Sequence, residues 1–321
     1  MALFFKIWAT LGILFGLVAL SDAAPLKIRI GRGGAGEEQL WLMAAKPEIA
    51  TNQGKSYVLE MINFPATDKR FLAFEAGELD IATGGSSGVL MFASSGAKVT
   101  AVASLSKESN KGFVAEYMVN ANSAIKTVKD LKGKTIGING FNSSTQLWAI
   151  MALQRAGIDP KDVTFVTLPF SAHGEALRAG KIDLGAFPQP FAKLEQVRGG
   201  SRTLFTSREG APFDEELILL VARPEFLKNN AEGVKAFLSD LVASTKYYEQ
   251  NPKVARQALI DAKFVRLPPS VYYEMTDYYR EPGARIDTAA LQETQNLQLK
   301  MGWQKTPVDI NTLVDLSYLP K

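Results

Sequence analysis

The sequence predicts an α/β protein built from two similar lobes, and two observations carry this prediction. Short apolar segments with the character of strands alternate with helical segments, as in sheets flanked by helices. Residues 72–81 also resemble residues 175–184, and each copy ends a helix with glycine before entering a buried strand. Glycine ends helices in many α/β chains, so this similarity alone does not show a repeat. A similar strand, loop and helix also precede each copy, and together these features predict two similar lobes.

The first unit follows from the order of apolar and polar residues after Pro25. Its expected elements are strands over residues 26–30, 57–62, 79–83, 98–104 and 115–119, a glycine-rich turn over 31–36, and helices over 37–50 and 68–76. Gly77 follows the second helix, where the left-handed conformation that glycine tolerates ends a helix well. Alternation of this kind predicts a sheet covered by helices.

The second unit repeats this order, and a helical segment follows it. We expect strands over residues 135–139, 163–168 and 182–187, a small polar loop over 140–144, and helices over 145–156 and 174–179. A further strand is expected over 217–221. Helices are then expected over 231–250, 252–262, 270–279 and 288–301, the first with an apolar face of period 3.6.

The composition excludes several classes of function. The chain has 321 residues, of which 46% are hydrophobic and 21% charged, with a net charge of +3, one His and no Cys. It is too apolar for disorder and too near neutral to suggest nucleic acid as a partner. The absence of Cys excludes disulfides and thiolate chemistry, and a single His excludes a multi-histidine metal site. We therefore expect no metal and no cofactor.

Residues 1–23 have the pattern of a signal peptide. Lys6 precedes an apolar run over residues 7–20, which as a helix reaches about 21 Å and falls short of the roughly 30 Å hydrocarbon core. Ser21-Asp22-Ala23 then predicts cleavage after Ala23. No Cys follows the run, so no lipid anchor is expected. A signal anchor is the alternative, and the prediction is an exported, soluble protein in the periplasm.

Three loops have the composition of a binding site at the carboxyl ends of strands, where helix N-termini offer free N–H groups. The first contains Arg32, Gly33, Gly34 and Ala35, the second contains Thr83, Ser86 and Ser87, and the third contains Phe141, Asn142, Ser143 and Ser144. Each loop alone also fits an ordinary helix cap or tight turn. Three such loops at equivalent places in two lobes predict a shared site.

The first loop also allows the hypothesis that the protein is an enzyme with a dinucleotide cofactor. The pattern G-x-G-x-x-G at Gly31–Gly36 lies between a strand and a helix, and Glu60 ends the next strand, as in dinucleotide-binding folds. An export signal argues against a nicotinamide cofactor. Glu37 and Glu38, in the first turn of the expected helix, would repel a pyrophosphate. His173 begins another expected helix, where it is either a packed residue or a reacting group.

The order of several motifs resembles one family. Residues 130–137 (DLKGKTIG) and 153–163 (LQRAGIDPKDV) follow an export signal in the order seen in periplasmic solute-binding proteins of ATP-driven importers for nitrate, sulfonates and taurine, a group that also contains pyrimidine-precursor binders. The resemblance implies a two-lobed type II periplasmic-binding-protein fold, each lobe a mixed sheet flanked by helices. Lobe I would span 25–118 plus 217–321 and lobe II 119–216, with crossovers near 115–120 and 215–221.

The resemblance also implies the contact residues of a cleft between the lobes. They map onto Gly33, Gly34, Ala35, Thr83, Ser86, Ser87, Asn142, Ser143, Ser144 and Gln189. Similar proteins often carry a Trp where this chain has Pro188, so stacking would come from Phe187, Phe141 or Phe64. Arg32 is the only cation in the three loops and either pairs with a sulfonate or carboxylate or faces water.

The resemblance therefore implies a binding protein rather than an enzyme. It would be a monomer that captures a small organic anion or zwitterion, such as a sulfonate, taurine or a carboxylate, and delivers it to the permease of an ABC importer. Glu37 and Glu38 favour a ligand that also carries an ammonium or other hydrogen-bond donors. The alternatives are an exported enzyme that uses a dinucleotide, a pyrimidine-forming relative that uses His173, and a sensory subunit.

Overall fold

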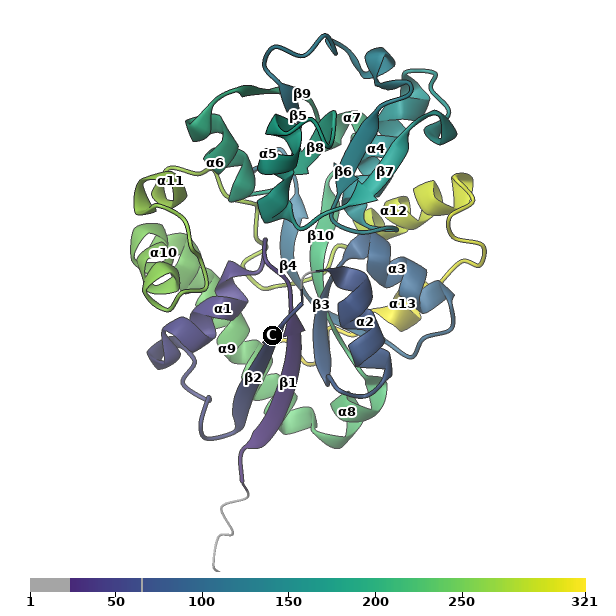
Figure 1. Ribbon diagram of the computed structural model, residues 1–321. Helices are drawn as coiled ribbons and strands as arrows, with labels where there is room; N and C mark the ends of the chain where they lie inside the picture. The colour runs from purple at the N-terminus through teal and green to yellow at the C-terminus, as the bar shows by residue number, and fades with distance from the viewer. Residues whose placement is uncertain (1–23, 65) are drawn as a thin grey trace, which may run out of the picture.

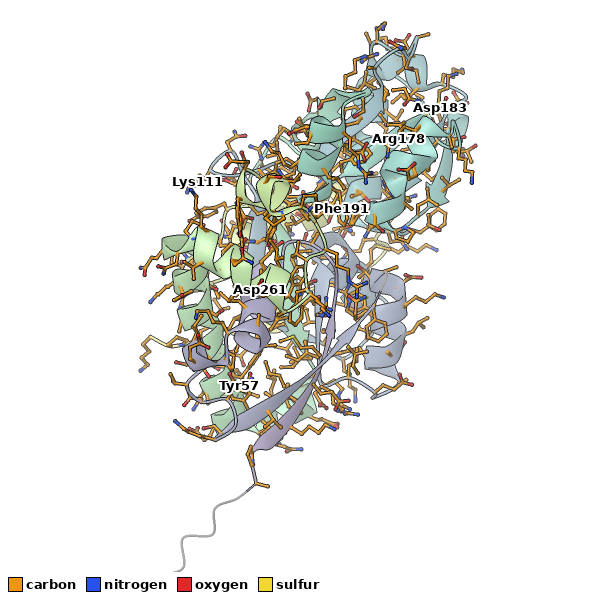
Figure 2. The ribbon with its side chains drawn as sticks, turned by 60° about the vertical axis from the view of Figure 1, so that its left-hand side comes forward. Tyr57, Lys111, Arg178, Asp183, Phe191 and Asp261 are labelled. Carbon is orange, nitrogen blue, oxygen red and sulfur yellow. The ribbon has the colours of Figure 1, made fainter. Side chains whose placement is uncertain are left out.

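The computed structural model describes residues 24–64 and 66–321, which form two units placed end to end (Figure 1). Figure 2 shows the same units from the side, with Tyr57 on one and Arg178 and Asp183 on the other. Within this described part, no helix is long and apolar enough to span a membrane. The predicted signal peptide lies outside the described residues.

The first unit is built on a five-stranded mixed sheet. Its strands, in spatial order, are β2 (Tyr57–Asn63), β1 (Leu26–Arg32), β3 (Ile81–Gly85), β10 (Glu215–Ala222) and β4 (Thr100–Glu108). Strand β1 pairs in parallel with β2 and β3, whereas β10 is antiparallel to both of its neighbours. The late strand β10 therefore lies inside a sheet otherwise made by the N-terminal part of the described chain.

The second unit repeats this arrangement. Its strands, in spatial order, are β7 (Thr164–Thr167), β6 (Thr135–Ile138), β8 (Leu184–Phe187), β5 (Glu116–Asn120) and β9 (Ser201–Thr206). Strand β6 pairs in parallel with β7 and β8, and β5 is antiparallel to β8 and β9. The predicted pair of similar α/β units with mixed sheets is thus present.

The chain passes between the two sheets at two places. It leaves the first sheet after Glu108 and enters the second at Glu116, and it returns after Thr206 to re-enter the first at Glu215. The crossovers expected at residues 115–120 and 215–221 fall largely in strands β5 and β10. The connecting segments precede these strands, at residues 109–115 and 207–214. The lobe boundaries given above stay a prediction.

Helices cover both sheets. Those of the first unit are α1 (Glu38–Ala45), α2 (Thr67–Glu75), α3 (Ser86–Ser94), α8 (Pro224–Asn229), α9 (Ala231–Gln250), α10 (Pro252–Asp261), α11 (Pro269–Tyr273), α12 (Thr288–Lys300) and α13 (Ile310–Leu313). Those of the second unit are α4 (Ser144–Arg155), α5 (Phe170–Arg178) and α6 (Phe191–Arg198), with the short α7 (Ser207–Gly210) on the returning connection. Single 3₁₀ turns lie at Pro47–Ile49, Val128–Leu131 and Pro160–Asp162.

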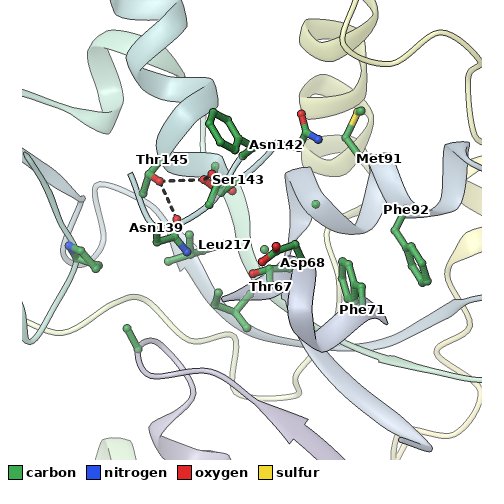
Figure 3. Close-up of a pocket in the computed structure, with 18 of the residues that line it drawn as sticks. Thr67, Asp68, Phe71, Met91, Phe92, Asn139, Asn142, Ser143, Thr145 and Leu217 are labelled. Carbon is green, nitrogen blue, oxygen red and sulfur yellow. Dashed lines mark hydrogen bonds between the residues drawn. The ribbon is translucent and has the colours of Figure 1, made fainter. Parts of the chain in front are cut away.

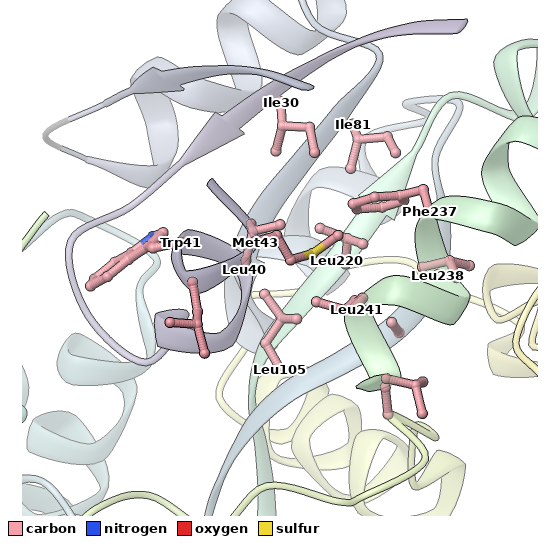
Figure 4. Close-up of a cluster of buried hydrophobic side chains, with 14 of the residues drawn as sticks. Ile30, Leu40, Trp41, Met43, Ile81, Leu105, Leu220, Phe237, Leu238 and Leu241 are labelled. Atoms are coloured by element: carbon pink, nitrogen blue, oxygen red, sulfur yellow. The ribbon is translucent and has the colours of Figure 1, made fainter. Parts of the chain in front are cut away.

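The core of the first unit lies between the sheet and helices α1 and α9. Figure 4 shows Leu40 and Met43 of α1 and Phe237 and Leu241 of α9 meeting Leu220 of β10. All of these side chains are fully buried, and the apolar face predicted for α9 is the face that packs. A separate cluster fills the second unit. Each unit therefore has its own core, and the second cluster also extends to Leu217 of β10 and to Tyr278.

Two elements differ from the prediction because of residues that neighbour them. The helix expected over 37–50 ends at Ala45, because Pro47 disfavours helical geometry at Lys46 and a separate 3₁₀ turn follows. The segment taken as a loop at residues 83–87 is the end of β3 followed by the first turn of α3. Helix α3 was missed, because Ser86, Ser87 and Gly88 have the composition of a loop.

The C-terminal region contains a third difference. The helix expected over 270–279 ends at Tyr273, and Tyr279 instead forms an isolated bridge with Lys107 of β4. Nη1 of Arg256 donates hydrogen bonds to the carbonyls of Tyr272, Tyr273 and Met275, which are groups that a continuing helix would use itself. Helices α6 and α8 and strand β9 were also not predicted.

Candidate functional site

A cavity of about 500 Å³ lies between the two units, at the ends of β3, β4 and β10 on one side and β6 and β8 on the other (Figure 3). Its lining residues are Ala35, Thr67, Asp68, Phe71, Leu72, Glu75, Gly85, Gly88, Met91, Phe92, Ser95, Glu108, Asn139, Gly140, Phe141, Asn142, Ser143, Ser144, Thr145, Trp148, Phe170, Pro188, Leu217, Ile218 and Tyr278. This volume is typical of small-molecule sites.

One wall is the N-terminus of α4 and carries most of the uncharged polar groups. Ser143 caps the helix, and its hydroxyl donates to the carbonyl of Gly140 at 2.6 Å and lies 3.0 Å from Oγ1 of Thr145. Thr145 Oγ1 in turn donates to Oδ1 of Asn139 at 2.8 Å (Figure 3). This network fixes the hydroxyl groups of the wall in place.

Ser144 in the same wall has unused hydrogen-bonding capacity. Its side chain is buried and lines the cavity, yet its hydroxyl has no hydrogen-bond partner among the described residues. The first N–H groups of a helix have no partner within it, and they favour negative charge. A hydroxyl and a helix N-terminus that open together into a cavity can hold an acid group of a ligand.

The opposite wall comes from α2 and α3 and carries most of the large apolar side chains. The rings of Phe71 and Phe92 stack with centroids 4.7 Å apart, and Leu72 and Met91 lie beside them. Gly84 of β3 allows this arrangement, since a Cβ there would lie 2.5 Å from Cζ of Phe71. The cavity therefore has hydroxyl and amide groups on the α4 side and stacked rings on the α2–α3 side, where Thr67 and Asp68 also lie (Figure 3).

The floor contains buried carboxyl groups. Glu108 accepts hydrogen bonds from the backbone N–H of Ala115 and from the hydroxyl of Ser207 at 2.7 Å, and burial raises its pKa to about 8. Behind it, Glu215 accepts from Nε1 of Trp148 at 2.8 Å, and burial raises its pKa to about 7. Near neutral pH both carboxyls are protonated for much of the time, so the floor is less negative than its composition suggests.

The other charged groups of the lining lie at the rim. Asp68 and Glu75 are exposed on α2, one on each side of Leu72. Among the described residues that line the cavity, none is Lys or Arg. An acid group bound here would be held by neutral donors and a helix N-terminus, not by an ion pair.

The structure brings together five of the predicted site residues at this cavity: Ala35, Phe141, Asn142, Ser143 and Ser144. The other eight do not line it: Arg32, Gly33, Gly34, Phe64, Thr83, Ser86, Ser87 and Gln189. Most of these eight already have partners within the protein.

The glycine-rich loop is closed by a buried carboxylate. Both carboxyl oxygens of Glu37 lie 3.0 Å from the backbone nitrogen of Gly33, which donates to them, and Oε1 also accepts from the hydroxyl of Thr83 at 2.6 Å. Arg70 lies against the same loop and donates to the carbonyl of Thr83. Glu37 thus occupies the N–H that a pyrophosphate would need, and the dinucleotide alternative is not favoured.

Two further charges near this loop also have internal partners. The guanidinium of Arg32 lies over the rings of Trp41 and Phe264, with its central carbon 5.5 Å and 5.0 Å from their centroids. Glu38 forms a buried ion pair with Arg280. Neither glutamate of the 37–38 pair faces the cavity, so the argument from this pair for an ammonium-bearing ligand no longer holds.

The remaining predicted residues join elements to each other. The hydroxyl of Ser87 on α3 donates to the carbonyl of Asn142 in the second unit at 3.2 Å, and the hydroxyl of Ser86 lies 3.4 Å from a carboxyl oxygen of Glu215. The side-chain oxygen of Gln189 accepts from the backbone of Lys193. Ser87 therefore marks a direct contact between the two units beside the cavity.

The aromatic residues expected to stack also lie elsewhere, except Phe141. Phe187 is buried in the core of the second unit, and Phe64 packs partly buried in the first. His173 is buried between Phe170 and Phe187, with Nε2 3.0 Å from the carbonyl of Leu168. Burial lowers its pKa, and it does not line the cavity.

Sequence reasoning missed the aromatic wall and the floor. Phe71, Phe92 and Trp148 lie in helices, and nothing in the sequence distinguishes them from aromatic residues of a hydrophobic core. Glu108 ends a strand four residues beyond its predicted end, and strand length is poorly marked in the sequence. Within the described residues, no group of three or more His, Asp or Glu side chains is placed to hold a metal ion.

Comparisons with known proteins show which family and which folds this chain is similar to. A family model described as NMT1/THI5 like matches residues 61–255. A putative aliphatic sulfonates-binding protein of Escherichia coli strain K12 is 27% identical over 288 residues, which cover 87% of this chain and 84% of the relative.

Solved structures are also similar. The ligand-binding component of an ABC-type import system from Staphylococcus aureus, with zinc bound, superposes with a TM-score of 0.75 at 19% identity, over 91% of this chain and 97% of that chain. The alkanesulfonate-binding protein of Xanthomonas axonopodis pv. citri, bound to MOPS, gives 0.72 at 21% identity, over 91% and 99%. These likenesses confirm the predicted two-lobed periplasmic-binding-protein fold.

Proposed function

Since the chain belongs to the NMT1/THI5-like family, we propose that it is the solute-binding component of an ABC importer. It captures a small organic solute in the cavity between the two units and delivers it to a membrane permease. The aliphatic sulfonates-binding relative and the alkanesulfonate-binding structure support a solute with a sulfonate or a similar acid group. We also propose that residues 1–23 are a signal peptide cleaved after Ala23, and that the mature protein acts in the periplasm.

The observation that carries the proposal is the N-terminus of α4 in the cavity wall. The unpartnered hydroxyl of Ser144 and the capping network of Ser143 and Thr145 lie together where the helix opens. An anion held by such neutral donors does not bury additional full charges, which would carry a large desolvation cost.

Binding and release require no covalent step, so we propose a carrier and not an enzyme. The two units each have their own core and are joined by the segments 109–115 and 207–214. Such a construction allows the units to close on a solute by bending at the connections. We also propose that the protein acts as a monomer, with one cavity in each chain.

Titration calorimetry with organic sulfonates and carboxylates tests the proposal. We expect the mature protein to bind at least one such acid, and Ser144→Ala to weaken binding about tenfold or more, as expected when a hydrogen bond to a charged group is lost. Ser317→Ala is the matched control, since Ser317 is exposed and does not line the cavity. No binding by any acid, or equal affinity in Ser144→Ala and the control, would overturn the proposal.

A further inference from the structure

The shape and composition of the cavity narrow the class of solute. On the basis of the proposed function, we propose that the acid group is carried on a bulky apolar body with a flat ring, such as an arylsulfonate, and that small sulfonates of the size of taurine are poor ligands. The acid group lies at α4, and the ring lies against the aromatic wall formed by Phe71, Leu72, Met91 and Phe92 on α2 and α3.

The size of the cavity supports a bulky solute. Its volume of about 500 Å³ corresponds to the space of roughly seventeen waters in the liquid. A two-carbon sulfonate bound at α4 would leave most of this volume filled with water against aromatic side chains. A ring-bearing solute displaces that water and buries the apolar surface.

The chemistry of the wall supports an apolar body. Leu72 and Phe141 are each 58% exposed and stand at the cavity on different units. A contiguous apolar surface exposed at a cavity is typical of a ligand-binding groove. Phe71 and Phe92 continue this surface inward from Leu72, and a ring can stack or pack edge-on against them.

Two glycines keep the space between the walls open. Gly85 and Gly88 line the cavity at the junction of β3 and α3. A Cβ at Gly85 would lie 3.4 Å from the hydroxyl of Ser144, and one at Gly88 would lie 3.7 Å from the ring of Phe71. A side chain at either position would project between the polar wall and the aromatic wall, where the proposal places the body of the solute.

The weak electrostatics of the site make the apolar body important. Since no lysine or arginine of the described lining pairs with the acid group, neutral donors provide all of its direct recognition. Asp68 and Glu75, exposed at the rim, oppose a bare anion. Burial of a ring supplies affinity that the polar contacts lack, and it does so only for solutes large enough to reach α2 and α3.

A series of sulfonates that share one acid group tests this inference by calorimetry. The series is methanesulfonate, taurine, hexanesulfonate, benzenesulfonate and a naphthalenesulfonate. We expect the two aryl compounds to bind at least about tenfold more tightly than methanesulfonate and taurine, which is about 1.4 kcal/mol. Hexanesulfonate, which is apolar but flexible, should fall between these groups, because its chain loses more conformational freedom on binding.

Rim variants locate the ring in the cavity. We expect Phe141→Ala and Leu72→Ala each to weaken benzenesulfonate binding about three- to tenfold while changing methanesulfonate binding by less than about twofold. Both side chains are exposed, so the variants should fold. Val197→Ala on α6, where Val197 is 59% exposed and does not line the cavity, is the matched control.

The outcomes separate this inference from the proposed function. Methanesulfonate or taurine binding as tightly as benzenesulfonate, or rim variants that weaken all sulfonates equally, would overturn the inference and leave the proposed function standing. Absence of binding by every sulfonate of the series and by every carboxylate tested would overturn the proposed function and the inference with it. Preference for the aryl compounds that is lost in the rim variants supports both.

Discussion

At the scale of single residues, burial determines what the acidic groups near the site do. Glu37 accepts a hydrogen bond from the glycine-rich loop, and Glu38 forms an ion pair with Arg280. Glu108 has no such cationic partner, and its pKa rises to about 8 because the charged form is poorly solvated. Three glutamates thus have three different roles: Glu37 holds a loop, Glu38 forms a buried ion pair, and Glu108 borders the cavity as a largely protonated carboxyl.

The raised pKa of Glu108 predicts a pH-dependent stability. The folded value lies above the ordinary value of 4.5, so the folded protein binds more protons than the unfolded chain between these values, and stability falls as the pH rises from about 5 to 8. Glu215, with a pKa of about 7, contributes in the same direction. We expect Glu108→Gln to flatten the fall in melting temperature over this range.

Scanning calorimetry at several pH values measures this effect. Glu293→Gln, which removes an exposed carboxylate on α12, is the control and should keep the wild-type slope. If the melting temperature of Glu108→Gln fell with pH as steeply as that of the wild type, protonation of Glu108 would not be the cause of the pH dependence.

At the scale of elements, long segments with a strong period were predictable and short ones were not. Helix α9 has the predicted bounds, since its apolar period runs for many turns. The internal repeat likewise predicted two similar units, and the two sheets have the same spatial arrangement of parallel and antiparallel strands. Helix α3 was not predictable, because its first residues resemble a loop and its apolar residues show no single face.

The site was predictable in part for a related reason. The α4 wall follows from local chemistry, since a Ser-Ser-Thr sequence before a helix marks an N-terminus. The aromatic wall depends on which helical phenylalanines border a gap between units, and the closure of the glycine-rich loop depends on Glu37 meeting Thr83 from a distant strand. Neither contact leaves a local pattern in the sequence.

Helix α10 provides a prediction at this scale. Arg256 is buried, donates to three carbonyls at the end of α11 and just beyond it, and pairs with Asp277 at 3.0 Å. Loss of the guanidinium leaves the three carbonyls without this donor and removes one of the two arginine partners of Asp277, which keeps Arg280. We therefore expect Arg256→Ala to lower the free energy of unfolding by about 3 kcal/mol. Hydrogen exchange should become faster over residues 269–277. Arg266→Ala, at an exposed arginine, is the control and should change neither measurement.

At the scale of the whole molecule, two cores and two connecting segments make relative motion of the units the expected response to a solute. The contact of Ser87 with Asn142 shows that the units touch beside the cavity. The remaining volume of about 500 Å³ between them is the space that a solute would occupy.

Spin labels test this motion, and the absence of native cysteine makes labelling specific. We expect Glu78→Cys on the first unit and Lys161→Cys on the second, labelled together, to show a narrower distance distribution when benzenesulfonate is added. With Ser144→Ala in the same background, the change should require about tenfold more solute. A distribution that is unchanged at saturating solute would contradict closure.

One carboxyl group gives this architecture a further property. Glu108 ends β4, accepts from Ala115 in the outgoing connection and from Ser207 in the returning one, and also borders the cavity. The same carboxyl group therefore links the two connecting segments and borders the cavity. A solute that contacts Glu108 would therefore act on both connecting segments directly, and its effect need not pass through the core of either unit.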